Sequence, residues 1–152
     1  MRFEGQNIAL FENFANIYGD ILNTITDDSI KIIVPTDRYA ECILEPDGLF
    51  QTNPAISFKH IGYNEENCKA INLTENEKFA MIAHELGHIY NNNICQFDEN
   101  ELLNREINAD IMACHLGLKD DLIRGLTKII ESQYCRNREQ IENRIEFLNN
   151  YH

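Results

Sequence analysis

The run of residues from Thr74 to Tyr90 constrains the fold more than any other part of the chain. Thr74 followed three residues later by Glu77 is the signature of a capping box, in which the two residues exchange hydrogen bonds at the start of a helix. Apolar residues then recur at helical spacing as far as Tyr90. The sequence therefore predicts a helix of about four turns with one face packed in the core.

The other face of this helix carries His84-Glu85-Leu86-Gly87-His88, the pattern H-E-x-x-H. Helical residues four apart lie about 40° apart around the axis and one turn along it, so both imidazoles can reach one metal ion. Glu85 projects about 60° beyond His88, close enough to act on water at the metal but poorly placed as a ligand. A glycine in mid-helix costs about 1 kcal/mol relative to alanine, so Gly87 predicts the close approach of another segment.

A third ligand is expected from Glu106, which follows His88 by 18 residues on a separate predicted helix. Two histidines and one glutamate form a known ligand set for catalytic zinc, with the fourth position left open. We therefore expect one Zn²⁺ per chain, held by His84, His88 and Glu106. Asp110 lies one helical turn after Glu106, where a carboxylate can accept the free ring N–H of a ligating histidine. Without the H-E-x-x-H motif, Glu106 and Asp110 would be interpreted as part of a solvent-exposed acidic face of their helix.

The rest of the chain predicts one α+β domain over residues 1–152. Helical periodicity indicates an opening helix from Ile8 to Ile25. Short β-rich runs broken by turn residues predict a small, mostly antiparallel sheet of three strands: Ile30–Val34, Cys42–Leu44 and Ala55–Ile61. Three helices are expected after the one that carries the metal ligands: Glu99–Leu116, Asp121–Gln133 and Arg138–Asn149.

Composition excludes several classes of function. The chain holds 13 basic and 25 acidic residues, a net charge of −12, which has the wrong sign for binding nucleic acid. No apolar run approaches the ~18 residues of a membrane span, and the Met1 end lacks a signal-peptide pattern. We expect a cytoplasmic protein without a membrane span. Five cysteines without a C-x-x-C pair predict reduced thiols rather than disulfides or a thiolate zinc site.

These residues resemble the gluzincin zinc metallopeptidases, and more narrowly the HtpX and CAAX-prenyl-protease family. The resemblance runs from about Leu73 to Leu148. It rests on the H-E-x-x-H helix, on Glu106-Ile107-Asn108-Ala109-Asp110, and on Asn143-Arg144-Ile145-Glu146-Phe147-Leu148. The chain departs from that family in lacking its membrane spans, and it has Arg138-Glu139 where the family often has His-Pro. In size it is similar to the soluble ImmA/IrrE group of gluzincins.

The resemblance implies a zincin-like core and an endopeptidase that hydrolyses peptide or protein substrates through a zinc-bound water. Glu85 would be the general base that takes the proton of this water. Arg144 matches the family's C-terminal arginine and would stabilise the oxyanion, with Tyr134 as the second candidate. We expect a substrate strand to add to a sheet edge at Ala55–Ile61.

An alternative keeps the fold and the metal but performs no turnover. In this interpretation the protein is a catalytically silent or latent regulatory module that recognises a partner protein. Glu85 argues against it, because a structural zinc site has no use for that carboxylate and usually closes its fourth position. A latent form could be blocked by the tail that ends at Tyr151-His152. The remaining histidines, His60, His115 and His152, are interpreted as surface or core residues.

Overall fold

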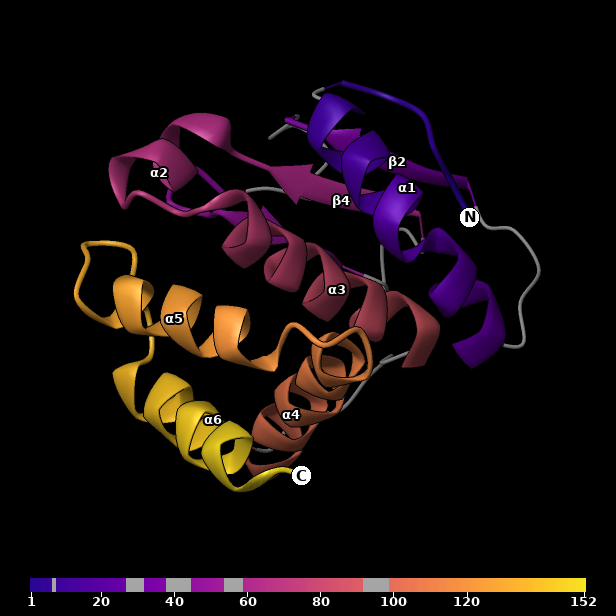
Figure 1. The fold of residues 1–152 in the computed structure, drawn as a ribbon. Helices are drawn as coiled ribbons and strands as arrows, with labels where there is room; N and C mark the ends of the chain where they lie inside the picture. The colour runs from indigo at the N-terminus through magenta and orange to yellow at the C-terminus, as the bar shows by residue number, and fades with distance from the viewer. Residues whose placement is uncertain (7, 27–31, 38–44, 54–58, 92–98) are drawn as a thin grey trace.

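The computed structural model describes residues 1–6, 8–26, 32–37, 45–53, 59–91 and 99–152. Within these ranges the chain forms six helices and a four-stranded sheet, so the α+β class is confirmed (Figure 1). The helices are α1 (Ile8–Ile25), α2 (Glu65–Ala70), α3 (Glu75–Asn91), α4 (Glu99–His115), α5 (Lys119–Ile130) and α6 (Arg138–Asn150). A search of the described helices for one long and apolar enough to span a membrane finds none.

Five of these helices lie where the sequence predicts them, because each has a periodic apolar face. The predicted Asp121–Gln133 helix is α5, which begins at Lys119 and ends at Ile130. Gly117 allows the early start, since its φ of 75° ends α4 in the left-handed conformation. The additional helix α2 is only six residues long and too short for a periodic signal; the side chain of Asn64 caps it by accepting the N–H of Asn67 at 2.9 Å.

The sheet differs from the prediction in its strand directions. Its strands are β1 (Arg2–Phe3), β2 (Ile32–Thr36), β3 (Phe50–Gln51) and β4 (His60–Tyr63), in the order β1-β2-β4-β3. The β1–β2 and β2–β4 pairs are parallel, and only β3 and β4 are antiparallel. The expectation of a mostly antiparallel sheet is therefore wrong. Parallel strands need a crossover connection, and α1 provides one between β1 and β2. The two-residue β1 carries no sequence pattern that reveals this pairing.

The predicted strands match the observed ones only in part. Ile30–Val34 corresponds to β2, displaced by two residues, and Cys42–Leu44 lies outside the described residues. The run Ala55–Ile61 overlaps β4 only at its last two residues, and β4 lies between β2 and β3. The expectation that this run forms a sheet edge is thus wrong for its described part. Among the described strands, β3 and β1 form the two edges.

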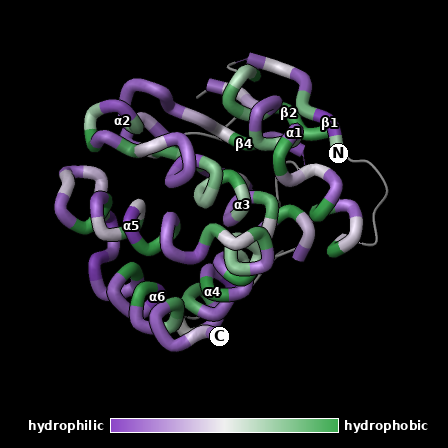
Figure 2. Tube along the Cα trace, viewed as in Figure 1, coloured by the Kyte–Doolittle hydropathy of each residue, from purple (hydrophilic) through white to green (hydrophobic). Residues whose placement is uncertain are grey.

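Helix α3 lies at the centre of the molecule, with the sheet and α1 on one side and α4, α5 and α6 on the other (Figure 1). A chain of aromatic rings joins α3 to the N-terminal half. Phe14 of α1 contacts Phe79 of α3 with ring centroids 5.8 Å apart, and Phe3 of β1 contacts Phe11 of α1 at 5.3 Å. Nearly every residue of α3 from Phe79 to Ile89 is buried, and green stretches mark this apolar interior in Figure 2.

The start of α3 is fixed by the predicted capping box. The backbone N–H of Thr74 donates to the Glu77 carboxylate, and the N–H of Glu77 donates to the Thr74 hydroxyl, both at 3.1 Å. Glu77 is only 2% exposed, and its charge is compensated by Lys128 of α5 at 2.5 Å. The capping box thus also ties α5 to the first turn of α3.

Two glycines allow helices to pack closely against α3. A Cβ on Gly87 would lie 2.7 Å from the Ala109 Cα of α4, so the close approach expected at this glycine is confirmed. A Cβ on Gly125 would lie 2.6 Å from the end of the Met81 side chain, which brings α5 against the same helix. Both contacts place α3 within reach of side chains from the C-terminal helices.

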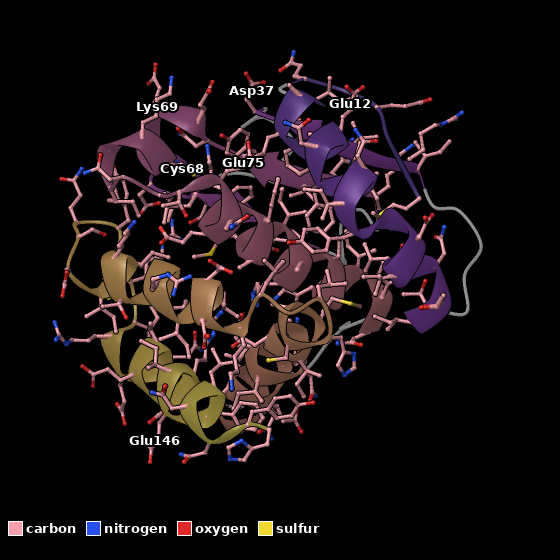
Figure 3. All side chains as sticks on the ribbon, viewed as in Figure 1. Glu12, Asp37, Cys68, Lys69, Glu75 and Glu146 are labelled. Carbon is pink, nitrogen blue, oxygen red and sulfur yellow. The ribbon has the colours of Figure 1, made fainter. Side chains whose placement is uncertain are left out.

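Charged side chains cover the outside of this arrangement. Glu12, Glu75 and Glu146 are exposed, and in Figure 3 the labelled Glu12 and Glu146 lie at the rim of the molecule. Cys68 is buried, and burial raises the pKa of its thiol to about 12. The described cysteines, Cys68, Cys114 and Cys135, form no disulfide with one another, while Cys42 and Cys95 lie outside the described residues.

Replacement of Gly87 by alanine tests the contact between α3 and α4. Because the new methyl group would overlap the Ala109 backbone, we expect Gly87→Ala to lower the free energy of unfolding by about 2–3 kcal/mol in urea denaturation. Gly19→Ala is the matched control, since no heavy atom lies within 4 Å of its added Cβ on α1. The control should gain about 0.4–1 kcal/mol. Equal stability changes in the two variants would contradict the tight crossing.

Candidate metal centre

Three side chains from two helices converge at the middle of α3. The Nε2 atoms of His84 and His88 lie 3.1 Å apart. Glu106 of α4 places its Oε2 atom 2.9 Å from His84 Nε2 and 3.3 Å from His88 Nε2. The close crossing of α3 and α4 at Gly87 brings Glu106 to the histidines. The structure therefore brings together the three residues that the sequence singles out as ligands, and this group could hold a metal ion.

The spacing of the three ligand atoms fits one small cation. Bonds of about 2.0–2.2 Å in tetrahedral geometry place neighbouring ligand atoms about 3.3–3.6 Å apart. The observed separations of 2.9, 3.1 and 3.3 Å lie at this value or a few tenths of an ångström below it. Two nitrogens and one carboxylate oxygen suit a borderline ion such as Zn²⁺. All three side chains are buried or half-buried, so little rearrangement is needed to close around an ion.

Asp110 orients the ring of His84. Its Oδ1 atom lies 2.6 Å from His84 Nδ1, so the ring can donate on that side while Nε2 faces His88 and Glu106. Burial and the nearby Arg144 guanidinium lower the pKa of His84, but the carboxylates of Asp110 and Glu106 outweigh them and raise it to about 10. The neighbouring carboxylates therefore favour the protonated form of this ring, and a metal ion that bound its Nε2 atom would displace the proton.

The two carboxylates remain ionised despite their burial. Burial alone would raise the pKa of Glu106, but hydrogen bonds and charge attraction from His84 and His88 hold it well below its usual range. Burial likewise opposes ionisation of Asp110, and the charge of Arg144 lowers its pKa. Both residues thus present full negative charge to the histidines, as the binding of a divalent cation requires.

Arg144 of α6 is buried behind this group. Its Nε atom donates to Asp110 Oδ2 at 2.9 Å and its Nη2 atom donates to Asp110 Oδ1 at 2.7 Å, a bidentate pair. Its Nη1 atom lies 3.9 Å from Glu106 Oε2. This arrangement favours a positioning role, in which Arg144 holds Asp110 and Asp110 holds His84. The oxyanion role expected for Arg144 stays a prediction, and two of its three nitrogens are already engaged elsewhere.

Glu85 lies beside the metal-binding group without belonging to it. Its Oε2 atom accepts a hydrogen bond from the Thr52 hydroxyl at 2.7 Å. Burial raises the pKa of Glu85, although His84 and His88 oppose the shift. Sequence reasoning did not find Thr52, because it lies 33 residues before Glu85, just after β3, and no local pattern marks it.

The metal-binding group and Glu85 share one cavity of about 280 Å³. One wall is the segment 47–52, which includes β3, and the opposite wall comes from residues 134–144 at the end of the α5–α6 loop and the start of α6. Tyr134, the second candidate for the oxyanion donor, is half-buried in that opposite wall. An apolar floor next to the metal-binding group is formed by Met81, Leu126, Ile129 and Ile141.

Several other expectations concern residues that lie away from this cavity. His60, His115 and His152 are not part of the metal-binding group and do not line the cavity. The tail at Tyr151-His152 does not line it either; the Tyr151 carbonyl accepts a hydrogen bond from Lys119 at 3.0 Å. The structure therefore gives no support to a tail that blocks the site.

No protein-family model, curated protein or solved structure matches this chain.

The substitution Asp110→Asn tests the support of His84. The amide keeps the shape but loses the charge that orients the ring, so we expect zinc affinity to fall by about 10–100-fold in competition with a chelator. Asp120→Asn, an exposed residue at the start of α5, serves as the control and should bind zinc as the wild type does. If Asp110→Asn binds zinc with wild-type affinity, the contact between Asp110 and His84 contributes to the fold but does not support metal binding.

The substitution Arg144→Ala tests the positioning role of this arginine. The variant leaves the buried Asp110 without its main cationic partner, and we expect the free energy of unfolding to fall by about 3–5 kcal/mol. Arg138→Ala is the control on the same helix, since its pair with Glu142 is exposed and should be worth at most about 0.5 kcal/mol. If Arg144→Ala unfolds at the same urea concentration as Arg138→Ala, the buried pair does not stabilise the site.

Proposed function

We propose that this protein is a zinc-dependent peptidase. The observation that carries the proposal is the position of Glu85, a buried carboxylate that lines the same cavity as His84, His88 and Glu106 without being one of the grouped ligands. A site built only to stabilise a fold would have no use for an acid there. The tetrahedral spacing of the other three residues supports zinc as the ion.

Zinc held by His84, His88 and Glu106 would supply Lewis-acid chemistry, polarising a carbonyl group and making water acidic near neutral pH. Side chains of the protein would supply the proton transfer and the stabilisation of charge that the reaction also needs. Glu85 accepts a proton from water and later delivers it to the leaving amine. Thr52 holds the Glu85 carboxylate in place through its hydroxyl group. Tyr134, which lines the same cavity, is the donor we propose to stabilise developing negative charge on the substrate.

The substrate we propose is an extended peptide. Among the described strands β3 is an edge, paired only with β4, and it forms part of the cavity wall. A peptide can add to such an edge through backbone hydrogen bonds, which bind the main chain regardless of sequence. This edge takes the role that the sequence assigned to Ala55–Ile61. The apolar floor around Met81 and Ile141 would accommodate one large apolar side chain of the substrate.

The proposal is tested by zinc content and by the substitution Glu85→Gln. Protein purified without added metal should contain about one zinc ion per chain, and His84→Ala or His88→Ala should lose most of it. Glu85→Gln should keep the zinc and lower kcat for peptide hydrolysis by about 10²–10⁴-fold, because the amide cannot accept the proton. Glu75→Gln, an exposed glutamate in the first turn of the same helix, should retain full activity.

Two results would contradict parts of this proposal. Zinc retained at the wild-type level in both histidine variants would remove the metal assignment. Zinc-loaded wild-type protein that cleaves no member of a broad peptide library, while a partner protein binds wild type and Glu85→Gln equally, would replace the peptidase by a regulatory module with the same metal centre.

A further inference from the structure

Two segments far apart in sequence are joined across the metal cavity by one side chain. Arg136, in the loop between α5 and α6, and Asp47, in the turn before β3, both line the cavity. The Nε atom of Arg136 donates to Asp47 Oδ2 at 3.1 Å, and its Nη2 atom donates to Asp47 Oδ1. Its Nη1 atom pairs with Glu45 of the same turn. All three nitrogens of this guanidinium are therefore directed to the opposite wall.

This contact is the polar link between the two walls. Among the described residues, no other hydrogen bond or ion pair joins the segment 45–52 to the chain from 131 to 152. An isolated surface ion pair contributes little, but a bidentate arginine–carboxylate pair extended by a second acid has the geometry in which such contacts do contribute. Arg136 is therefore the residue through which these two described segments are held together by polar contacts.

Both ends of the link are held by their own local structure. On the acidic side, the N–H of Gly48 donates to the Glu45 carbonyl at 2.8 Å, and the Asn67 side chain of α2 donates to the Pro46 and Gly48 carbonyls at 3.0 and 2.8 Å. On the other side, Asn137 caps α6 by accepting the N–H of Gln140 at 3.0 Å. Figure 1 shows α2 and the α5–α6 loop at the same end of the molecule.

We infer that Arg136, Glu45 and Asp47 form a strap that controls access to the metal, with Arg136 as the residue that determines what enters. The inference rests on the proposed metal centre, since the metal is the group to which access is controlled. The strap joins two segments that both line the cavity, so a peptide lying across both of them would have to part it.

The strap should open more readily as ionic strength rises. The side chains of Arg136, Glu45 and Asp47 are 47%, 57% and 51% exposed, so salt screens their attraction. Loss of the arginine would separate the walls permanently and remove this dependence. Loss of Glu45 and Asp47 would also separate the walls and remove the salt dependence. Because this change makes the net charge less negative while loss of Arg136 makes it more negative, equal effects of the two changes would distinguish a strap from an effect of net charge.

The experiment measures how fast 1,10-phenanthroline, a neutral chelator, removes zinc from the folded holoprotein in stopped flow. The relevant quantity is the part of the rate that depends on chelator concentration, because it reports the chelator reaching the bound ion. We expect Arg136→Gln and the double variant Glu45→Gln/Asp47→Asn each to raise this rate constant by about three- to thirty-fold. Wild type should accelerate between about 20 mM and about 500 mM salt, and neither variant should.

Arg138→Gln is the matched control, because Arg138 lies two residues away, pairs with Glu142 and does not line the cavity. It should behave as wild type at every salt concentration. Hydrogen exchange of the backbone amides in 45–52 provides a second readout. This exchange should be faster in Arg136→Gln than in wild type, and unchanged in Arg138→Gln.

The possible outcomes separate this inference from the proposed function. Zinc-loaded protein whose release rate is the same in wild type, Arg136→Gln and Arg138→Gln overturns the strap and leaves the metal centre intact. Faster amide exchange in Arg136→Gln without faster zinc release also overturns it, since the contact would then hold the turn without controlling access. Protein that contains no zinc removes the metal centre and the strap together, and zinc analysis before the kinetics identifies that case.

Discussion

The contact between α3 and α4 at Gly87 is the constraint on which the rest of the site depends. Because no Cβ intervenes, the backbone of Ala109 approaches α3 closely enough for Glu106 and Asp110, one turn apart on α4, to reach the same histidine. A wider crossing would separate Glu106 from His84 and His88. The energetic cost of a mid-helix glycine is thus offset by a geometry that larger residues do not allow.

The polar groups behind the ligands form one buried series from α3 through α4 to α6. His84 contacts Asp110, and Asp110 contacts Arg144, with every member shielded from water. Each charge in this series has an opposite partner, which is the condition under which buried charges are tolerated. Packing of α6 and orientation of the His84 ring therefore depend on the same buried contacts, so α6 is part of the structure that holds the site in place.

The parts of this structure that sequence could predict are mostly those encoded by spacings within helices. The pair His84 and His88, the capping box at Thr74 and the pair Glu106 and Asp110 all follow from a spacing of three or four residues. The meeting of Glu106 with the histidines was predicted from the H-E-x-x-H motif, which needs a third residue from another helix. The direction of the sheet could not be predicted, because β1 is too short to show alternation. Thr52 and Arg136 were missed for another reason. Their partners lie 33 and 89 residues away, and only the tertiary fold brings them together.

The pairing of charges around His84 determines what the fold needs from a bound ion. The carboxylates of Glu106 and Asp110 face His84 and Arg144, so each negative charge has a partner within the chain. Small zinc domains, in contrast, stay unfolded until metal binds because nothing else satisfies their ligands. This chain balances the same charges with its own side chains, so the fold itself neutralises them without an ion.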